Sequence, residues 1–500
     1  MSDLTSKREG AAAETAGTWD PGRIPEPVFD AQPGWIKLYW RAQELAYAHV
    51  KSVPGLPQNP YMDEGFDPGA LWIWDTCFMS LFCRYAPEVF PGIESLNNFY
   101  ACIHDGVDLP VKIQHPDNPP LFAWVEEQYF QITGDTSRLK WLLEDNCYLQ
   151  KHFHWFRSLA RGATFPWARA VVGLQPHEAG FQWNGVASGM DNSPRFDPGD
   201  QIFAIDALAQ QGLSARCISR LAAEINNGSL AAEYRQHFES IRDRVNRCYW
   251  DELDGIYYDL LPDGKTPSRV KTPASFWPLL AGMATPRQAA RMAEHVKNPE
   301  CLGGEVPWCT VERSSPGFDA STGGYWRGAV WLPTAYLGIR ALSENGHGEL
   351  ADQTAEAVLA HMARTFACFH PQTIWECYHP VRPEPSVNRR GKQVRPDFCG
   401  WSALGPISLL LEHVLGFHSI SAVERRVKWR LHQRGRHGIR RLRFGKILTD
   451  ILTDGNESAE VCSSHPYTLE INGTDYAIRP GQQTLALRPG LVRDAGVHVA

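Results

Sequence analysis

The 500-residue chain lacks any uninterrupted apolar run of about 18 residues, the length that a membrane-spanning helix requires. Its first residues, Met-Ser-Asp-Leu-Thr-Ser-Lys-Arg-Glu-Gly, have no apolar stretch behind their charges, so no secretory signal is indicated. We therefore expect neither membrane insertion nor secretion and predict a cytoplasmic protein.

Paired cysteines are also missing. The 12 cysteines are scattered and include no Cys-x-x-Cys motif. Several of them, among them Cys77, Cys83, Cys217 and Cys368, have apolar neighbours, which is typical of reduced thiols in a protein core.

An excess of basic charge is absent as well. The formal net charge is -7, so neither nucleic acid nor an anionic membrane is an expected partner, and a small neutral substrate fits better. One basic run spans residues 425–446, but its alternation with apolar residues favours a solvated strand face with paired arginines over an acidic-polymer site.

The common catalytic motifs are not present. His177-Glu178 has no second histidine at the spacing of a metalloprotease helix. The chain also has no Gly-rich phosphate loop, Gly-x-Ser-x-Gly elbow or dinucleotide-binding fingerprint. No metal or organic cofactor is implied.

The chain divides by composition into three parts. Residues 1–30 are rich in Ala, Gly, Pro and charge without periodicity, which predicts a flexible arm. Over residues 31–423, apolar residues recur at helical spacing in segments that alternate with long Gly/Pro/Trp-rich connections. No solenoid-type repeat is visible, so we expect the helices to close into a toroid of hairpins, with functional residues on the connections at one end.

Strand patterns begin after Phe417. Val427, Trp429 and Leu431 alternate with basic residues, the period of a half-buried strand. Farther on, Asn472-Gly473 separates two short strand-like segments and predicts a hairpin. Residues 424–500 are therefore predicted to form a small β accessory domain.

Tryptophan, in contrast, is abundant: the chain has 18 Trp. Four clusters combine aromatic residues with glycine and charged side chains: Trp72-Ile-Trp74-Asp75; Phe181-Gln-Trp183-Asn184 through Ser188-Gly189-Met190-Asp191-Asn192-Ser193-Pro194-Arg195; Gly324-Tyr325-Trp326-Arg327-Gly328 with Trp331; and Trp375-Glu376-Cys377-Tyr378, followed by Gly400-Trp401. Sugar rings commonly stack on indole, although tryptophan also fills large cores.

Glycoside hydrolysis uses two carboxyl groups in different environments, and an aromatic wall raises the pKa of a carboxyl group by penalising its charged form. Asp191 and Glu376 are the candidates. Taken singly, the first also fits a turn or helix cap and the second a half-exposed loop residue. Asp75 fits either a helix N-terminus or a contact to a sugar hydroxyl.

Other members of the clusters also have structural alternatives. Arg327 also fits a buried structural arginine paired with a carboxylate. Trp326 and Trp331 lie five positions apart, so on one helix they would not share a face, and one of them is expected in the core.

These strings resemble the bacterial branch of glycoside hydrolase family 63, which includes mannosylglycerate and glucosylglycerate hydrolases and is related to processing α-glucosidases and trehalases. The matching segments span roughly residues 70–410, and Gly-Met-Asp-Asn-Ser-Pro-Arg with Tyr-Trp-Arg-Gly is the most specific of them. The resemblance implies a mainly α fold, an (α/α)6 toroid barrel. The β region is C-terminal here, whereas processing α-glucosidases have a large N-terminal β domain.

The resemblance also implies the site residues. Asp191 falls at the position of the family's general acid and Glu376 at that of its general base. Residues at positions that line the sugar subsite in relatives are Trp74, Asp75, Gly189, Trp326, Trp331 and Trp401. The same clusters add Trp183, Asn184, Arg195, Arg327 and Trp375 as candidate substrate-binding residues.

We therefore predict an inverting glycosidase that releases an α-linked glucosyl or mannosyl unit from a small glycoside or oligosaccharide. Two other classes stay open: a glycoside phosphorylase or polysaccharide lyase on the same toroid, and a non-catalytic carbohydrate-binding protein. The sequence does not indicate the leaving group, exo or endo action, or the oligomeric state.

Overall fold

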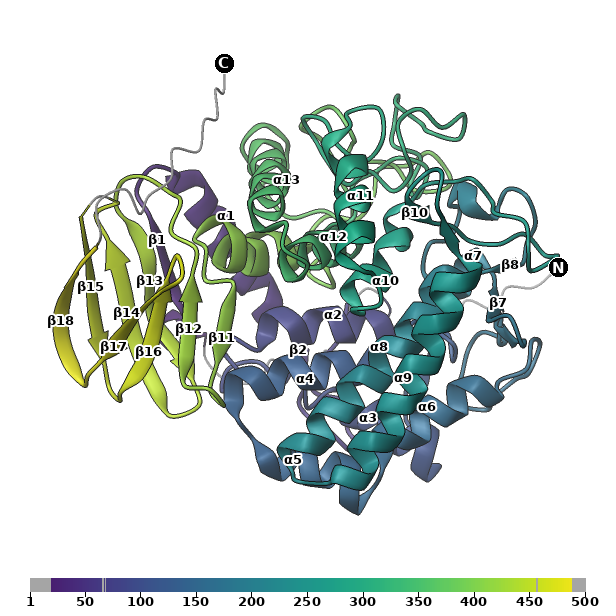
Figure 1. Ribbon diagram of the computed structural model, residues 1–500, viewed down its shortest axis with the longest axis horizontal. Helices are drawn as coiled ribbons and strands as arrows, with labels where there is room; N and C mark the ends of the chain where they lie inside the picture. Colours follow the sequence, from purple (N-terminus) through teal and green to yellow (C-terminus); the bar gives the residue numbers. More distant parts are fainter. Residues whose placement is uncertain (1–18, 65–66, 68, 456, 488–500) are drawn as a thin grey trace, which may run out of the picture.

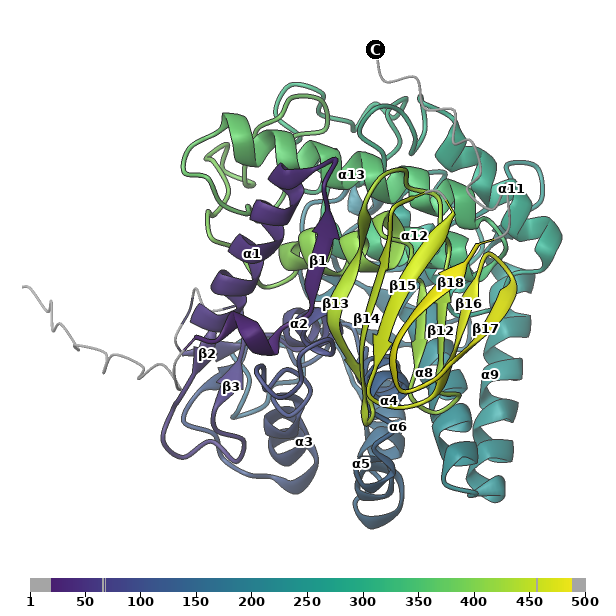
Figure 2. The same ribbon diagram turned by 90° about the vertical axis from the view of Figure 1, so that its left-hand side faces the viewer.

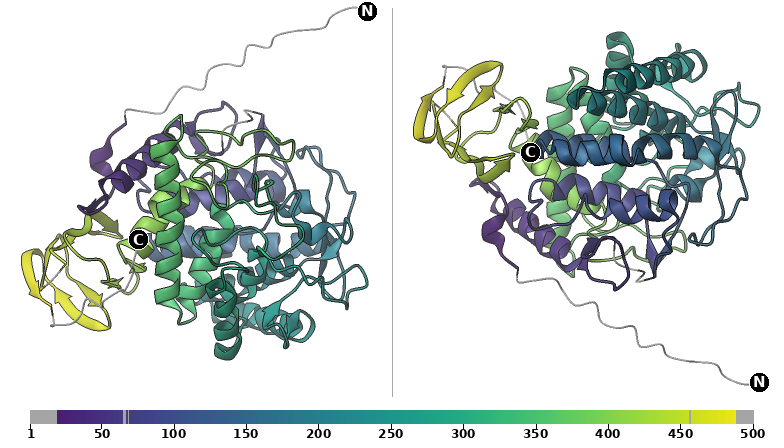
Figure 3. Two further views of the ribbon diagram at one scale, coloured as in Figure 1. Left: turned by 90° about the horizontal axis from the view of Figure 1, so that it is seen from above. Right: turned by 90° about the horizontal axis from the view of Figure 1, so that it is seen from below.

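A computed structural model describes residues 19–64, 67, 69–455 and 457–487. The protein has a helical body and, at one side of it, a strand-rich part (Figure 1). Seen from above and from below, the strands again lie beside the helical body and do not pass through it (Figure 3).

One set of helices packs in a closed order. Each member contacts the next, and the last pair contacts the first. In that order they are α2 (Ile73–Cys83), α4 (Phe122–Thr133), α8 (Ile205–Glu224), α10 (Trp277–Leu280), α12 (Leu332–Glu344), and η5 (Ser402–Leu404) with the π-helix η6 (Gly405–Val414). Every residue of α2 and η6 is buried, including polar side chains such as Asp75 and Glu412.

A second set of helices lies against the first or beside it: α1 (Pro33–Ala48), α3 (Leu96–Asp105), α6 (Tyr148–Ser158), α9 (Gly228–Cys248), α11 (Pro286–Lys297) and α13 (Gly348–Cys368). These helices are amphipathic. For example, α9 packs on α8 and buries only Ala231, Tyr234, Ile241 and Val245.

Short helices and strands make up much of the connections. The helices are η1 (Pro21–Arg23), α5 (Thr136–Lys140), η2 (Trp141–Asp145), α7 (Gly185–Ser188), η3 (Pro194–Phe196) and η4 (Pro273–Phe276). The strands are β2 (Val50–Lys51), β3 (Tyr61–Met62), β4 (Ala70–Leu71), β5 (Lys112–Ile113), β6 (Gln175–Pro176), β7 (Phe181–Trp183), β8 (Ile202–Phe203), β9 (Trp250–Asp251) and β10 (Ile256–Tyr257).

The strand-rich part consists of two facing sheets (Figure 2). One sheet has the order β1-β13-β14-β15-β18 and the other β11-β12-β16-β17. The strands are β1 (Glu26–Phe29), β11 (Ser419–Ser421), β12 (Arg426–Trp429), β13 (His437–Phe444), β14 (Ile447–Thr453), β15 (Ser458–Ser463), β16 (Tyr467–Ile471), β17 (Thr474–Ile478) and β18 (Gly481–Ala486).

Aromatic side chains fill the space between the two sheets. Phe444 of β13 packs edge-on against Tyr467 of β16, and Trp429 of β12 lies against His437 of β13. The predicted alternation around Val427 and the hairpin at Asn472-Gly473 are both present, and both turn residues have positive φ, as a primed turn requires.

The strand-rich part extends beyond the predicted range of 424–500. Strand β1 lies within the predicted flexible arm, 1–30, yet pairs with β13 in the register Glu26↔Arg440. Residues 1–18 lie outside the described residues. Strand β11 likewise begins before residue 424 and pairs with β12. Both strands owe their conformation to a partner strand, which explains why a local pattern does not reveal them.

The cysteines are free. Cys77, Cys83 and Cys217 are buried as predicted. Cys368 is exposed, because it is the last residue of α13, so the prediction of a core position is wrong for this residue. Within the ranges described, no helix combines the length and the apolar character that crossing a membrane requires.

Candidate active site

A cavity of about 330 Å³ lies where several helices of the closed series begin. Trp72 is the N-cap residue of α2, Trp331 that of α12 and Trp401 that of η5, and all three side chains line this cavity. The N-terminal ends of these helices therefore gather around one space. Its lining residues are Glu64, Trp72, Trp74, Asp75, Gln114, His115, Asn118, Val186, Gly189, Asp191, Tyr325, Trp326, Trp331, Glu376, Arg389, Arg395, Phe398 and Trp401.

Indole rings form a continuous wall of the cavity. The rings of Trp326 and Trp331 stack with centroids 4.0 Å apart, and Trp401 lies 5.3 Å from Trp331. Trp74 contacts both Trp326 and Trp401. One of Trp326 and Trp331 was expected in the core; both are 1% exposed and pack in the buried core, and both also line the cavity. Trp326 precedes α12, so helical periodicity does not set its direction.

The segment that carries Asp191 is a tight turn after the short helix α7. Gly189 ends α7 with φ of 84°, in the left-handed region that favours glycine. A Cβ atom at Gly189 would lie 2.6 Å from the Trp74 ring, so this position also requires glycine for space. The close approach of the chain to Trp74 places Asp191 at the indole wall.

The Asp191 carboxyl group is largely withdrawn from water, and its side chain is 20% exposed. Burial raises the pKa of Asp191 to about 6, while the guanidinium group of Arg389 opposes that rise. Arg389 Nη2 lies 3.4 Å from Asp191 Oδ2. A carboxyl group with this pKa holds a proton in a substantial fraction of molecules near pH 6.

Asn192 connects the Asp191 segment to the loop before α12. Its Nδ2 donates to the carbonyl of Gly324 at 3.0 Å, and its Oδ1 accepts from the backbone N–H of Trp326 at 3.0 Å. Tyr325, between these two residues, has φ of 67°. Asn192 thus fixes the position of Tyr325 and Trp326 relative to Asp191.

Glu376 lies deeper in the cavity and is 5% exposed. The hydroxyl of Tyr325 donates to Glu376 Oε1 at 2.8 Å, and the backbone N–H of Arg395 donates to Oε2 at 3.4 Å. The indole N–H of Trp401 donates to the Glu376 carbonyl at 2.9 Å. These contacts hold Glu376 in one orientation.

Asp75 is the third carboxyl group with an unusual environment. It lies in the first turn of α2, is 2% exposed, and its Oδ2 has no hydrogen-bond partner among the described residues. Burial raises the pKa of Asp75 well above its usual range, and the nearby carboxylates of Glu64 and Glu376 add to that rise. Oδ2 is therefore available to a ligand hydroxyl.

Five predicted binding residues do not line the cavity: Trp183, Asn184, Arg195, Arg327 and Trp375. The first three belong to the framework behind the Asp191 segment. Trp183 donates to Asp117 at 3.3 Å, and Asn184 caps α7 by accepting from the N–H of Ala187.

The two arginines of this set have carboxylate partners. Arg195 is fully buried and makes two-pronged pairs with Asp206 and Asp259. Arg327 pairs with Asp197 at 2.7 Å, as its structural alternative predicts, but its side chain is 32% exposed and not buried. Trp375 is 1% exposed and packs edge-on against Phe369.

Ten lining residues were not predicted as site residues: Glu64, Trp72, Gln114, His115, Asn118, Val186, Tyr325, Arg389, Arg395 and Phe398. Trp72, Val186 and Tyr325 lie within the aromatic clusters found in the sequence. Their position beside predicted site residues could have identified them as lining residues. Arg389 and Arg395 lie in a Pro- and Arg-rich stretch that contains no tryptophan. Nothing in that stretch distinguishes these two arginines from the other arginines around them.

A metal site was not predicted. Across the described part of the chain, no group of three or more His, Cys, Asp or Glu side chains is placed to share a metal ion.

Comparison with known proteins gives a family and a fold. The model of the mannosylglycerate hydrolase MGH1-like glycoside hydrolase domain matches residues 111–393, more than half of the chain. A protein of Borreliella burgdorferi described as uncharacterized is 26% identical over 443 residues, which cover 85% of this chain and 86% of the relative.

Two solved structures illustrate the fold. The GH63 mannosylglycerate hydrolase from Thermus thermophilus, in complex with Tris and D-glycerate, matches with a TM-score of 0.57 and 17% identity, over 74% of this chain and 99% of that chain. The neutral trehalase of Saccharomyces cerevisiae matches with a TM-score of 0.50 and 16% identity, over 69% of this chain and 72% of that chain.

Proposed function

Because the chain belongs to the mannosylglycerate hydrolase MGH1-like glycoside hydrolase family, we propose that it hydrolyses an α-linked glucosyl or mannosyl unit with inversion at the anomeric carbon. Asp191 is the general acid and Glu376 the general base. The observation that carries this proposal is that two carboxyl groups 185 positions apart in the sequence line one tryptophan-walled cavity in unlike environments.

The two environments suit the two roles. Asp191, with its raised pKa of about 6, keeps a proton that it can give to the glycosidic oxygen. Glu376 accepts hydrogen bonds from the Tyr325 hydroxyl and the Arg395 backbone N–H, which hold it in place as a base that activates water. The difference between the groups thus comes from their surroundings rather than from their chemistry.

In the proposed reaction, Asp191 protonates the leaving oxygen while Glu376 takes a proton from a water molecule on the opposite face of C1. The C1–O bond to the leaving group breaks as the water oxygen bonds to C1, so an α-glycoside gives a β sugar. This displacement needs room for the water, and carboxyl groups about 6.5–9.5 Å apart provide it.

The sugar ring is proposed to lie against the wall formed by Trp74, Trp326, Trp331 and Trp401. Indole faces offer a large apolar contact to the C–H groups of a pyranose. Asp75, whose Oδ2 has no partner among the described residues, is proposed to accept a sugar hydroxyl. Such a contact would compensate the cost of its burial.

The leaving group is proposed to carry a carboxylate. Arg389 and Arg395 bring two guanidinium groups to the cavity lining, and both side chains are about half exposed and so can reach a ligand at its mouth. The Thermus mannosylglycerate hydrolase was solved with D-glycerate, an anion of this type. A glycerate conjugate is therefore the first substrate to test.

We infer, further, that the helices form an (α/α)6 toroid with a separate β accessory domain. The closed order of contacts from α2 through η6 supports the toroid. The two facing sheets support the accessory domain, to which β1 at residues 26–29 also contributes.

A substrate screen with two amide variants tests the proposal. The wild type is expected to hydrolyse an α-glucoside, α-mannoside or glycerate conjugate. Asp191→Asn and Glu376→Gln should each lose about two to four powers of ten in kcat, the usual contribution of proton transfer. Asp200→Asn, an exposed aspartate in the same segment, is the matched control and should keep wild-type activity.

A substrate with a leaving group that needs no proton separates the two roles. On an α-glycosyl fluoride, Asp191→Asn should regain most of the lost rate, whereas Glu376→Gln should stay inactive. The proposal fails if the wild type hydrolyses none of these glycosides, or if Asp191→Asn hydrolyses all of them at the wild-type rate.

A further inference from the structure

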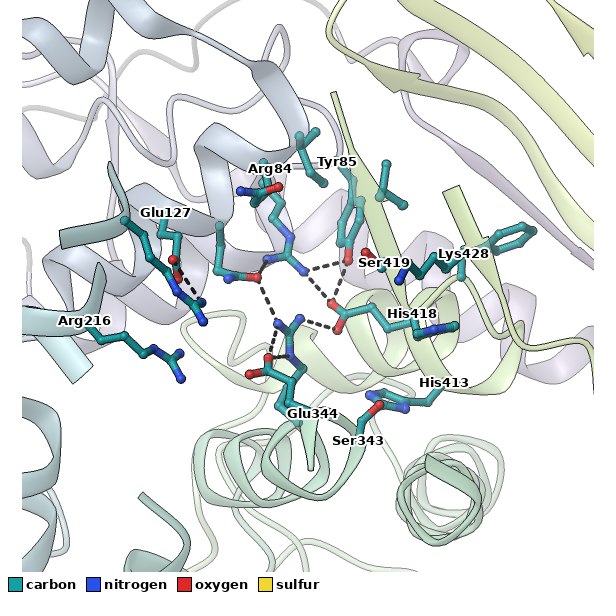
Figure 4. A pocket seen from close by; sticks show the side chains of 18 residues that line it. Arg84, Tyr85, Glu127, Arg216, Ser343, Glu344, His413, His418, Ser419 and Lys428 are labelled. Atoms are coloured by element: carbon teal, nitrogen blue, oxygen red, sulfur yellow. Dashed lines mark hydrogen bonds and ion pairs between the residues drawn. The ribbon is translucent and has the colours of Figure 1, made fainter. Parts of the chain in front are cut away.

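A second cavity, of about 340 Å³, lies at the other end of the same helices (Figure 4). Helix α2 begins at the candidate active site with Trp72 and ends here at Arg84, and α12 runs from Trp331 to Glu344 in the same sense. Strand β12 contributes Lys428 from the strand-rich part. The cavity is as large as the candidate active site and within the range of about 300–1,000 Å³ typical of ligand pockets.

One half of this cavity is a satisfied charge network around Glu412. Its carboxylate accepts from Arg84 at 2.8 Å, from Arg340 at 3.1 Å and from the hydroxyl of Tyr85 at 2.6 Å. Figure 4 shows these bonds converging on one carboxylate. Arg84 is also the C-cap residue of α2, where a cation is favourable. These two arginines therefore have a structural explanation.

The other half has a cation without a paired carboxylate. Arg216 lies in the middle of α8; within the described residues no ion pair joins it to a carboxylate, and its buried Nε has no hydrogen-bond partner. Figure 4 shows the Arg216 side chain with no dashed line to its neighbours. The two carboxylates that could serve it are engaged elsewhere: Glu127 with Arg220 at 3.4 Å, and Glu344 with Arg340 at 2.7 Å.

The balance of charge in the lining is positive. Its five cations are Arg84, Arg216, Arg220, Arg340 and Lys428, and its three carboxylates are Glu127, Glu344 and Glu412, an excess of two positive charges. His413 also lines the cavity; it is 1% exposed, and its Nε2 has no partner among the described residues. The excess is carried by side chains that water partly reaches, since Arg220 is 60% exposed and Lys428 39% exposed, and a bound anion would pair with it.

We propose that this cavity binds a phosphate group, free or carried by a small metabolite. Arg216 is its main ligand, because a guanidinium group donates two parallel hydrogen bonds to a phosphate. Arg220 and Lys428 add positive charge from α8 and β12. A bound anion would then join the helical body to the strand-rich part, and it would raise the thermal stability of the whole chain.

Thermal unfolding and titration calorimetry test this proposal without any activity assay. Inorganic phosphate and glucose 6-phosphate are compared with sodium chloride at equal ionic strength. Phosphate is expected to raise Tm in a saturable manner. Arg216→Gln should weaken phosphate binding about ten- to hundredfold, the effect of losing a charged hydrogen-bond donor. Arg235→Gln, on the exposed face of α9, is the matched control and should bind as the wild type does.

Lys428→Gln serves as a second variant with a smaller expected loss, about two- to fivefold, because Lys428 is 39% exposed and also pairs with Glu470. Phosphate binding by Lys428→Gln can be measured even if Arg216→Gln does not fold, so the proposal stays testable. Tighter binding of glucose 6-phosphate identifies a phosphorylated metabolite as the ligand, and equal affinities identify free phosphate. The proposal is overturned if neither compound gives a saturable shift beyond chloride, or if both variants bind as tightly as the wild type.

Discussion

Replacing Arg389 by glutamine removes the cation that pairs with Asp191, and the pH dependence of catalysis should respond. Asp191 acts in its protonated form, so kcat/KM falls as pH rises through its pKa in the free enzyme. The alkaline limb of the wild-type profile is therefore expected near pH 6. Arg389 favours the charged form of Asp191, so its loss raises this pKa and moves the alkaline limb to higher pH.

The size of the change follows from the geometry. Two unit charges at the 3.4 Å that separates Arg389 from Asp191 attract by about 1 kcal/mol in water, which is a little less than one pKa unit. Arg389 is 51% exposed, so solvent screening reduces the expected shift to about half a pH unit at low salt. At about 1 M salt the difference between wild type and variant should nearly vanish.

The assay is a pH profile of kcat/KM for wild type, Arg389→Gln and Arg390→Gln. Arg390 is the adjacent exposed arginine and does not line the cavity, so its variant should follow the wild-type profile. An alkaline limb that stays in place in Arg389→Gln, moves to lower pH, or moves equally in Arg390→Gln would refute the electrostatic role assigned to Arg389.

Three further variants test the framework of the site. Gly189→Ala, strained by positive φ and by contact with Trp74, should lower the free energy of unfolding by about 1–3 kcal/mol in urea titrations and reduce kcat/KM. Asn192→Ala should lower kcat/KM about ten- to hundredfold by releasing the loop of Trp326, with a Tm loss of only a few degrees. Arg195→Met leaves two buried carboxylates unpaired and should cost about 3–5 kcal/mol of unfolding free energy, against little change for Arg235→Met.

For each of these three variants, one result would contradict the role assigned to the residue. A stable and active Gly189→Ala would mean that the chain can move away from the indole wall. An Asn192→Ala variant that loses stability in proportion to activity would make Asn192 a general structural residue. An Arg195→Met variant as stable as the Arg235→Met control would remove the basis for treating Arg195 as framework.

The sequence allowed the carboxylates and most of the tryptophan wall to be identified because they stand in distinctive strings at helix starts. Trp331 and Trp401 are N-cap residues, and Asp191 follows Gly189 in a turn that only glycine allows at this distance from Trp74. At such positions the geometry of the backbone or the lack of space permits few residue types, so the sequence alone indicates them.

The same strings could not separate residues that face the cavity from residues that support it. Trp183, Arg195 and Trp375 share motifs with lining residues, yet all three are buried and none of them lines the cavity. A loop that presents one side chain needs others to anchor it, and its irregular backbone has no period from which side-chain direction can be inferred. Trp326 and Trp331 show that the two roles can coincide, because both are buried and both line the cavity.

Contacts between distant parts of the chain were also beyond the sequence pattern. Strand β1 forms because residues 26–29 pair with residues 437–440. Arg389 becomes significant only because the fold brings it to Asp191. Neither relation has a local sequence pattern that would reveal it.

The stereochemistry of hydrolysis tests the central claim most directly. Proton NMR of the first product released from an α-glycoside, recorded before mutarotation, distinguishes the two anomers. Inversion by Asp191 and Glu376 predicts that the β anomer appears first. Initial appearance of the α anomer would contradict the assignment of Glu376 as a base acting through water.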